Sequence, residues 1–385
     1  MLKIIYDSEI AGHHTEYISH LINFITNDKN NREKYIFLVP EEMQYKFPDI
    51  IKLTENYDTI KWEFIPNEQC TFLQALPLYK RSFAELKLVK AYADKFNVKE
   101  VFLLYFNIFQ LALIFKRPSF EVKGILFLQF YRMQRDTILK KLKYYRKYWV
   151  TKLYCHNSKI KTVFVLNDDK TVDFLNAKFN TSKFKILFDP IPVYDAEIEF
   201  DAYKHYNIPR HKKILIHPGA IDPRKGTYEI IDAVDILGEK ESEEFAILIV
   251  GKAKADIENV LKEKLSVLKN KQFTILFDNS FVSNMRLKSL ILQSYAVLMP
   301  YKNVEASSGI LGHAAINNKL VLAPNSGLIG DIIKKYKLGI LIDRTTAMCI
   351  ANGIENLHNY DTDEILAAEF VSEHTAAIFS RSLLN

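Results

Sequence analysis

The sequence of 385 residues has little cysteine and no long hydrophobic run. Its three cysteines lie far apart and share no Cys-x-x-Cys or Cys/His spacing, so we expect them to be reduced and structural, with no disulfide framework or zinc site. The longest apolar stretch, residues 101–115, is shorter than the roughly 20 residues that a membrane-spanning helix requires. The amino terminus lacks the apolar core of a secretory signal, and we expect a cytoplasmic protein.

Two motifs that would point to other enzyme mechanisms are also missing. No GxGxxG motif follows a predicted strand, which argues against a nucleotide-dependent oxidoreductase. No Asp-x-Asp loop lies between predicted strands to bind a divalent cation, and the acidic run at 167–169 looks like a helix start. We therefore expect neither a bound metal nor a resident cofactor.

Short apolar runs alternate with stretches of helical period along the chain. Because parallel neighbours need a crossover connection, this alternation predicts an α/β fold with parallel sheets covered on both faces. The strands expected in the first half are residues 3–6, 36–39, 101–105, 125–129 and 162–166. Those expected in the second half are residues 214–217, 246–250, 274–277, 296–299, 320–323 and 339–342.

The alternation is interrupted at residues 188–201 by two prolines and a cluster of acids. We predict two Rossmann-like domains, residues 1–195 and 196–360, and a helical tail at 361–385. Their parallel sheets are expected to face an interdomain cleft. Ligands of open parallel sheets bind beyond the carboxyl ends of strands, so the loops that follow strands are the candidate sites.

The loop after the strand at 214–217 combines small and basic residues. Gly219 permits a sharp turn, and Arg224 and Lys225 precede Gly226 at a helix start. Cations at this place can bind a phosphate over the strand end. The same pattern also occurs in ordinary structural turns, and this loop alone leaves both interpretations open.

A second loop of this kind follows the strand at 296–299. Ser307, Ser308 and Gly309 begin a helix whose N–H groups and dipole favour an anion, although the serines also suit a helix cap. Glu305 precedes the turn. A carboxylate would repel a phosphate there unless it binds sugar hydroxyls instead.

Together the two loops resemble the carboxyl-terminal domain of retaining glycosyltransferases of the family-4 type, which have the GT-B fold. Gly219, Lys225, Gly226 and the run at 230–233 match the family's first loop. The likeness covers much of the second domain and reaches the first domain only in outline.

The family's second signature is two glutamates separated by seven residues. Glu305 occupies the first position, whereas His313 stands at the second. The arginine usual beside the first glycine is replaced by Ala220. These departures favour an alternative function, that of a non-catalytic GT-B protein that binds a sugar or nucleotide without transferring it.

The resemblance implies a metal-independent, retaining hexosyltransferase that acts in cell-surface polysaccharide assembly. Its partners would be a nucleotide-sugar donor and a glycan or lipid-linked acceptor. The donor-binding residues that it implies are Gly219, Arg224, Lys225, Glu305, Ser307, Ser308, Gly309, Ile310 and His313. We assign catalytic roles to Glu305 at the donor sugar, Lys225 at the departing diphosphate and His13.

A glycine and two histidines separate the first strand from the first helix. Gly12, His13 and His14 lie in the loop that, by the same resemblance, faces the acceptor. The pKa of histidine suits proton transfer near neutrality. We expect one of the two histidines to face the cleft, and two histidines on an ordinary surface loop are the alternative.

Residues 129–161 contain ten basic residues and one acid, a net charge of +9, whereas the whole chain carries +6. An apolar stripe recurs in this segment at helical spacing: Ile138, Leu142, Tyr145, Trp149 and Leu153. We expect this stripe to pack on its own domain. The competing interpretation is contact of residues 132–153 with an anionic membrane surface. Nucleic acid, which the basic residues alone would suit, is not expected as a partner.

Overall fold

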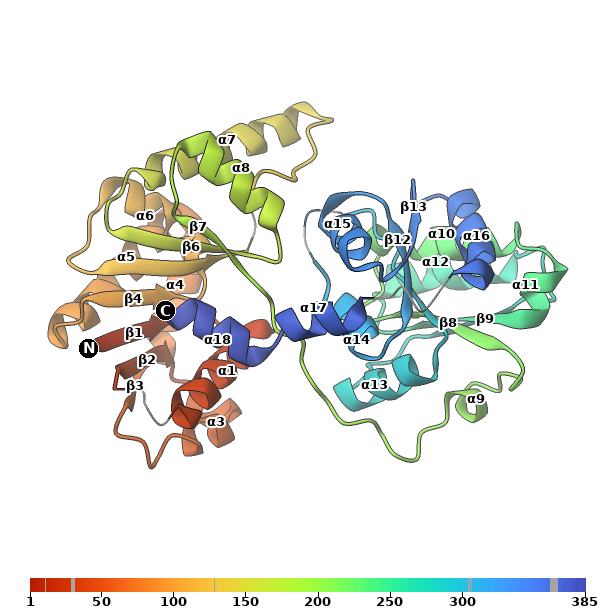
Figure 1. Ribbon diagram of the computed structural model, residues 1–385, viewed down its shortest axis with the longest axis horizontal. Helices are drawn as coiled ribbons and strands as arrows, with labels where there is room; N and C mark the ends of the chain where they lie inside the picture. The colour runs from red at the N-terminus through yellow and green to blue at the C-terminus, as the bar shows by residue number, and fades with distance from the viewer. Residues whose placement is uncertain (11, 29–31, 128, 304, 306, 361–365) are drawn as a thin grey trace. The chain divides into compact units, whose positions relative to one another are not determined.

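A computed structural model describes residues 1–10, 12–28, 32–127, 129–303, 305, 307–360 and 366–385 (Figure 1). The chain forms two compact units: unit 1 is Met1–Asp189 with Thr375–Asn385, and unit 2 is Pro190–His374. The predicted boundary at 195/196 thus lies slightly beyond the observed one. The predicted tail divides between the units, and its residues 361–365 lie outside the described part of the chain.

Unit 1 is built on a parallel sheet that, in the described residues, has seven strands in the order β3-β2-β1-β4-β5-β6-β7. The strands are β1 (Leu2–Tyr6), β2 (Lys34–Pro40), β3 (Ile60–Ile65), β4 (Glu100–Leu103), β5 (Glu121–Leu126), β6 (Ile160–Leu166) and β7 (Phe184–Leu187). The interior strands are almost continuous apolar runs, as expected of strands that are buried on both faces.

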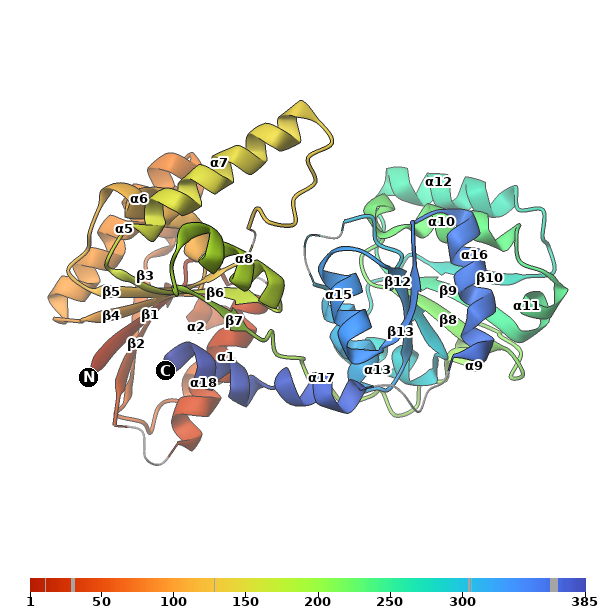
Figure 2. The same cartoon turned by 45° about the horizontal axis from the view of Figure 1, so that its top comes forward.

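Helices cover both faces of this sheet (Figure 2). One face is packed by α4 (Asn67–Ala75), α5 (Leu78–Lys95), η1 (Phe106–Ile108), α6 (Gln110–Phe115), α7 (Ile138–Cys155) and α8 (Asp169–Phe179). The other face is packed by α1 (His13–Asn27), α2 (Met43–Lys46), α3 (Pro48–Lys52) and α18 (Ala376–Leu384). The last of these comes from the far end of the sequence, and its Phe379 ring lies 4.6 Å from that of Tyr17.

Two strands of unit 1 were not predicted from the sequence, and they are the two edges of the sheet. β3 carries Lys61 and Glu63, and β7 carries Lys185. Charged side chains are tolerated at an edge because one side of the strand meets solvent. They also break the apolar run on which the prediction of a strand depends.

Unit 2 has a six-stranded parallel sheet in its described residues, in the order β10-β9-β8-β11-β12-β13. The strands are β8 (Lys213–Pro218), β9 (Phe245–Val250), β10 (Thr274–Asp278), β11 (Ala296–Leu298), β12 (Leu320–Pro324) and β13 (Gly339–Ile342). All were predicted to within two residues of their ends. Two parallel sheets of this kind confirm the predicted α/β class.

Helices cover both faces of the second sheet as well. One face is packed by α10 (Thr227–Val234), α12 (Ala255–Ser266), α16 (Ala347–Glu355) and η3 (Asn356–Asn359). The short helix α11 (Glu239–Glu244) leads directly into β9. The other face is packed by α9 (Ala202–His205), α13 (Asn284–Gln293), α14 (Gly309–Ile316), α15 (Gly327–Tyr336) and α17 (Ala367–Glu373). A short helix, η2 (Pro223–Lys225), precedes α10.

The orientation of α7 corrects the sequence analysis. The predicted stripe is exposed rather than buried: Ile138, Leu142, Tyr145, Trp149 and Leu153 all face solvent. Tyr144, Tyr148 and Tyr154 pack toward the core instead, the first two against the ring of Phe130. Helical spacing identified an apolar face but did not say which face meets the sheet.

Within the described residues, no helix is both long enough and apolar enough to span a bilayer.

Candidate functional site

In unit 2, the loop after β8 is shaped by two glycines with positive φ. Gly219 has φ +95° and Gly226 has φ +77°. A Cβ at Gly226 would lie 2.2 Å from the carbonyl oxygen of Pro300, so this position leaves no space for a side chain. Asp222 caps η2 by accepting a hydrogen bond from the N–H of Arg224 at 2.9 Å. The chain therefore turns tightly and presents two consecutive cations.

The loops after β8 and β11 join at a small cavity. The N–H of Lys302 donates to the carbonyl of Arg224 at 2.8 Å. The cavity has a volume of about 200 Å³ and is lined by Arg224, Lys225, Tyr301, Asn303, Ser307 and Ser308. Four residues of the predicted donor site, Arg224, Lys225, Ser307 and Ser308, thus come together at the carboxyl ends of adjacent strands.

Lys225 is the inner cation of this cavity. Its Nζ lies 5.5 Å from the centroid of the Tyr301 ring, and a Cβ at Gly219 would meet the same Nζ at 3.3 Å. Burial, together with the charge of Arg224, lowers the pKa of Lys225, and Asp222 offsets this only in part. Among described residues Lys225 forms no ion pair. An anion in the cavity would therefore gain a cation that lacks a built-in counter-charge.

Arg224 is the outer cation. Its side chain is 65% exposed and its Nε lies 3.4 Å from a carboxylate oxygen of Asp222. Exposure and a long contact make this pair weak. The guanidinium is thus available to a ligand at the mouth of the cavity.

Tyr301 was not predicted as a site residue, yet it lines the cavity and has a buried hydroxyl. The side chain is only 7% exposed, and its buried hydroxyl makes no hydrogen bond with any described residue. Burial raises the pKa of Tyr301 to about 12, although the neighbouring Ser308 and Arg224 act in the opposite sense. The phenol therefore stays protonated and can donate to an anion. The signal available in the sequence was a tyrosine two residues after a predicted strand, at the start of the second candidate loop.

The remaining predicted donor residues lie around α14. Ser308 is its N-cap residue, and Ile310 approaches Gly219, since a Cβ there would lie 3.8 Å from Ile310 Cδ1. Gly309 is open, because a Cβ built on it meets no atom within 4 Å. His313 is buried and its ring stacks on Tyr194 at 5.8 Å. Within the described residues His313 does not line the cavity.

Glu305 is partly exposed, and its N–H donates a hydrogen bond to Oδ1 of Asn303 at 3.1 Å. Both of its chain neighbours, residues 304 and 306, lie outside the described part of the chain. Among the described residues that line the cavity, Asn303 is present and Glu305 is not. Glu305 therefore lies in one of the two loops that form the cavity, but it is not among the described residues that line it.

His217 lies in the strand that precedes the first loop of the cavity, and it also was not predicted. It is fully buried in β8, where Nδ1 lies 2.8 Å from the carbonyl of Leu298 and Nε2 lies 2.9 Å from Oγ1 of Thr227. Since a carbonyl only accepts, Nδ1 carries the proton and Nε2 accepts from the threonine. Burial lowers the pKa of His217 to about 4. It is a neutral group that ties two strands to the start of α10.

In unit 1, the loop after β1 positions His14 through a buried carboxylate. Nδ1 of His14 lies 2.7 Å from Oδ2 of Asp7, which is fully buried. The imidazole is stacked on Phe127 at 5.8 Å and meets Tyr105 edge-on at 5.6 Å. Burial lowers the pKa of His14, but the hydrogen bond and charge of Asp7, with Glu9, more than offset it and raise the pKa.

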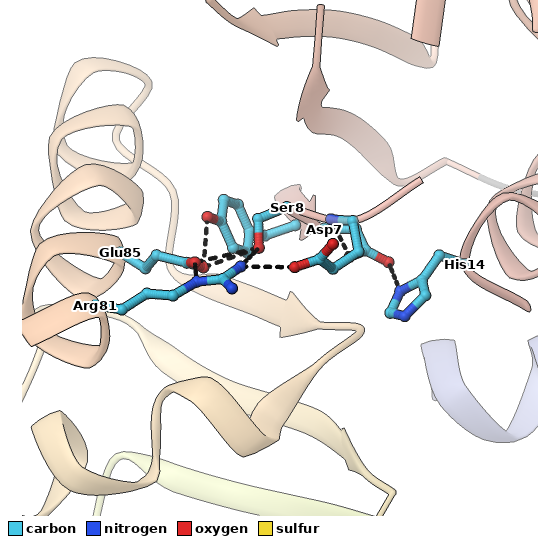
Figure 3. A network of polar contacts seen from close by, with 7 residues as sticks. Asp7, Ser8, His14, Arg81 and Glu85 are labelled. Atoms are coloured by element: carbon cyan, nitrogen blue, oxygen red, sulfur yellow. Dashed lines mark hydrogen bonds and ion pairs between the residues drawn. The ribbon is translucent and has the colours of Figure 1, made fainter. Parts of the chain in front are cut away.

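A second network supports the same loop from α5 (Figure 3). Glu85 is fully buried and accepts hydrogen bonds from Tyr6 at 2.8 Å and from Arg81 at 2.5 Å. Arg81 also donates to Glu9 at 2.7 Å. Figure 3 shows Arg81 and Glu85 on one side of the loop and His14 on the other. The loop is therefore held from both sides by charged groups that have partners.

The two histidines of this loop differ in their surroundings. The His13 side chain is 55% exposed and its Nδ1 lies 3.4 Å from Glu16, whereas His14 is only 16% exposed. Gly12, with φ +64°, is the residue that precedes α1 and allows the turn between strand and helix. His14 is thus the better positioned of the two, although His13 was named as catalytic from the sequence.

We compared the chain with protein families, curated proteins and solved structures. Residues 200–370 match the family model "Glycosyl transferases group 1". No curated protein matches the chain in sequence. The matched segment contains the whole cavity of unit 2.

Solved structures resemble the chain over nearly its full length. A glycosyltransferase from Rickettsia africae has a TM-score of 0.63 at 14% identity, covering 100% of this chain and 96% of its own. WaaG, a glycosyltransferase involved in lipopolysaccharide biosynthesis, has a TM-score of 0.61 at 14% identity, with coverages of 99% and 97%. HepE of Anabaena, solved in complex with UDP-glucose, has a TM-score of 0.60 at 11% identity, with coverages of 100% and 98%. At these identities the likeness shows the fold, and that fold is GT-B.

Proposed function

We propose that the protein is a glycosyltransferase that moves a hexose from a nucleotide-sugar donor to a glycan or lipid-linked acceptor. The observation that carries the proposal is the cavity of unit 2. It combines two cations, the start of α14 and a buried hydroxyl that makes no hydrogen bond with any described residue. A diphosphate suits this set of donors, because each phosphate oxygen accepts charge-assisted hydrogen bonds.

The match of residues 200–370 to a glycosyltransferase family supports this choice of reaction over other uses of a diphosphate site. HepE, which has the same fold, was solved with UDP-glucose. By analogy we propose a nucleoside diphosphate sugar as donor. The lipopolysaccharide role of WaaG supports cell-surface polysaccharide assembly at the cytoplasmic face of the membrane as the setting.

In the proposed reaction, the bond between the anomeric carbon and the diphosphate oxygen breaks and its electron pair leaves with the diphosphate. The acceptor hydroxyl attacks the anomeric carbon from the same face, and its proton passes to the departing diphosphate oxygen. This gives retention of configuration and requires no metal. Lys225, Arg224 and Tyr301 stabilise the negative charge that develops on the leaving group.

Roles follow for the other predicted residues. Glu305 binds hydroxyls of the donor sugar, and His313 accepts or donates a hydrogen bond at the ribose. In unit 1, we assign the acceptor-side contact to His14 rather than His13. Asp7 holds its Nδ1, so Nε2 is the atom that can meet a hydroxyl.

A donor screen followed by a matched pair of variants tests the proposal. Nucleotide sugars are first ranked by the rise in melting temperature that binding produces. Turnover of the best donor is then measured for wild type, Glu305→Gln and Glu355→Gln, the last being an exposed glutamate of α16. We expect kcat/KM to fall roughly a hundredfold for Glu305→Gln and to stay unchanged for the control. Equal activity of all three proteins would remove Glu305 from the site.

The second candidate is a protein that binds the donor without transferring it, favoured by Ala220 and His313 in place of the family's residues. Slow release of nucleoside diphosphate without an acceptor distinguishes the two. A transferase hydrolyses the donor slowly, whereas a binding protein releases none. NMR of the product's anomeric proton separately tests retention, and turnover in excess chelator tests independence from metal.

A further inference from the structure

The helix α7 leaves more large apolar side chains exposed than any other described helix of unit 1. Six large side chains lie along it with these exposed fractions: Ile138 76%, Leu139 72%, Leu142 61%, Tyr145 55%, Trp149 53% and Leu153 48%. We call these residues the α7 stripe. Soluble proteins rarely leave so many large apolar groups together in water without a partner to cover them.

The opposite face of the helix already has its own packing. Tyr144 and Tyr148 meet the ring of Phe130 at 5.1 and 5.7 Å, and Thr151 and Tyr154 are buried. The hydroxyl of Thr137 caps the first turn by accepting from the N–H of Lys140. The helix is therefore fixed to unit 1 by one face, and the α7 stripe remains for something outside the unit.

Cations border the α7 stripe on both sides. At 100° per residue, Lys141 and Lys143 project on either side of Leu142, and Arg146 lies within the arc of the stripe. All three are exposed, and they form no ion pair with any described residue. Nζ of Lys152 lies 4.9 Å from the ring of Trp149. Apolar groups along the centre with free cations at the margins form the pattern of a helix lying in a membrane interface.

We propose that the α7 stripe and its bordering cations dock unit 1 on an anionic lipid bilayer. The aliphatic and aromatic side chains would enter the boundary between headgroups and acyl chains, while Lys141, Lys143 and Arg146 reach lipid phosphates. This occupant explains both components of the surface. A nucleic acid would use the cations but leave the aliphatic side chains in contact with phosphates and water. A second copy of the same surface would bring unpaired cations against one another.

The proposal does not rest on the glycosyltransferase reaction, since it concerns binding to vesicles alone. Sedimentation with vesicles of 70% phosphatidylcholine and 30% phosphatidylglycerol tests it with two matched pairs of variants. Lys141→Glu/Lys143→Glu is compared with Lys254→Glu/Lys334→Glu, which changes the net charge equally at exposed sites of unit 2. Leu142→Gln/Trp149→Gln is compared with Val267→Gln/Phe281→Gln, whose side chains are 69% and 85% exposed.

Wild type and both control variants should sediment with these vesicles. Each α7 variant should bind at least roughly tenfold more weakly, with an unchanged melting temperature, because the altered side chains are exposed. Binding of wild type should weaken as salt rises past about 0.15 M, where the Debye length is near 8 Å. Vesicles of phosphatidylcholine alone should bind it poorly.

Tryptophan fluorescence gives a second measurement, because the chain has only two tryptophans. Trp149 is 53% exposed, whereas Trp62 is partly buried and donates to Oγ1 of Thr54 at 2.8 Å. Anionic vesicles should shift the emission of wild type to shorter wavelength. Trp149→Phe, which retains Trp62, should show no shift.

Several outcomes would overturn the proposal. One is that wild type stays in the supernatant with anionic vesicles, and another is that the α7 variants bind as wild type does. Binding to RNA that depends on Lys141 and Lys143 but not on Leu142 and Trp149, without vesicle binding, would assign the surface to nucleic acid. A dimer in light scattering that Leu142→Gln/Trp149→Gln converts to monomer, again without vesicle binding, would assign it to a second copy.

Discussion

The loops after β1 in unit 1 and after β8 in unit 2 occupy equivalent places in two parallel sheets, yet their charged side chains are paired to different extents. In unit 1, Asp7 pairs with His14 and Glu9 pairs with Arg81. In unit 2, Lys225 forms no ion pair with any described residue, and Arg224 has only a long, exposed contact with Asp222. The charges of the first loop are paired, in part by Arg81 of α5, whereas the second loop retains positive charge. Because its positive charge is not neutralised by described residues, the unit 2 loop favours the binding of an anion.

The difference between the two loops depends first on the backbone conformation of the unit 2 loop. The substitution Gly226→Ala should disrupt this conformation. The new Cβ would lie 2.2 Å from the Pro300 carbonyl oxygen and 2.8 Å from Thr345 Cγ2, at φ +77°. We expect a loss of about 2–4 kcal/mol in the free energy of unfolding, measured by urea denaturation. Gly309→Ala is the control, because its Cβ meets no atom within 4 Å. Equal stability of the two variants would show that the loop is not held as described.

The free charge itself is tested by Lys225→Ala. Losing a charge-assisted contact to phosphate costs about 1.5–3 kcal/mol, or roughly ten- to a hundredfold in affinity. Calorimetric titration with a nucleoside diphosphate should show this loss. The melting temperature should not fall, because burial and Arg224 lower the pKa of Lys225 and the folded protein gains nothing from its charge. Unchanged affinity would mean that Lys225 does not contact the ligand.

Tyr301→Phe sharpens the comparison with a smaller change. Removing a buried hydroxyl that lacks a partner among described residues should leave stability equal or slightly higher. Affinity for the same nucleoside diphosphate should fall by about tenfold, as expected for one hydrogen bond to a charged acceptor. A variant that binds as well as wild type would show that the hydroxyl is not directed at the ligand.

The balanced loop of unit 1 predicts a pH effect instead, tested by His14→Asn, which keeps a donor near Asp7 but does not titrate. Because the folded-state pKa of His14 is raised, its protonated form stabilises unit 1. This contribution is complete below the ordinary pKa of histidine, about 6.5, and is lost as pH rises through the raised value. The stability difference between wild type and variant should therefore be largest at pH 5.5 and smallest at pH 8.5. A difference that does not change with pH would contradict the charged pair.

Apolar runs and glycine-containing loops were sufficient to predict the sheet of unit 2 and four residues of its cavity. Strands β8 and β11 are buried runs of high β-propensity, and the loops after parallel neighbours meet at one edge of a sheet. Tyr301 was missed because its importance comes from burial of its hydroxyl, which depends on how the two loops meet. The edge strands β3 and β7 were missed because their charged residues resemble a loop.

The α7 stripe shows a different limit of sequence analysis. The spacing of Leu142, Tyr145 and Trp149 correctly predicted one face of a helix, but a core face and a membrane face have the same period. Only the packing of Tyr144 and Tyr148 against Phe130 decides which face is inside.

The docking of α18 on α1 has a consequence for synthesis of the chain. Phe379 and Leu383 are fully buried in unit 1, although all of unit 2 is translated before them. A ribosome therefore releases the completed segment 190–374 while the first sheet still lacks its last helix. The usual order, in which the amino-terminal domain folds first during synthesis, is reversed at the final step. Unit 1 is completed only when α18 has emerged, and until then the ring of Tyr17 in α1 lacks the Phe379 ring that packs against it.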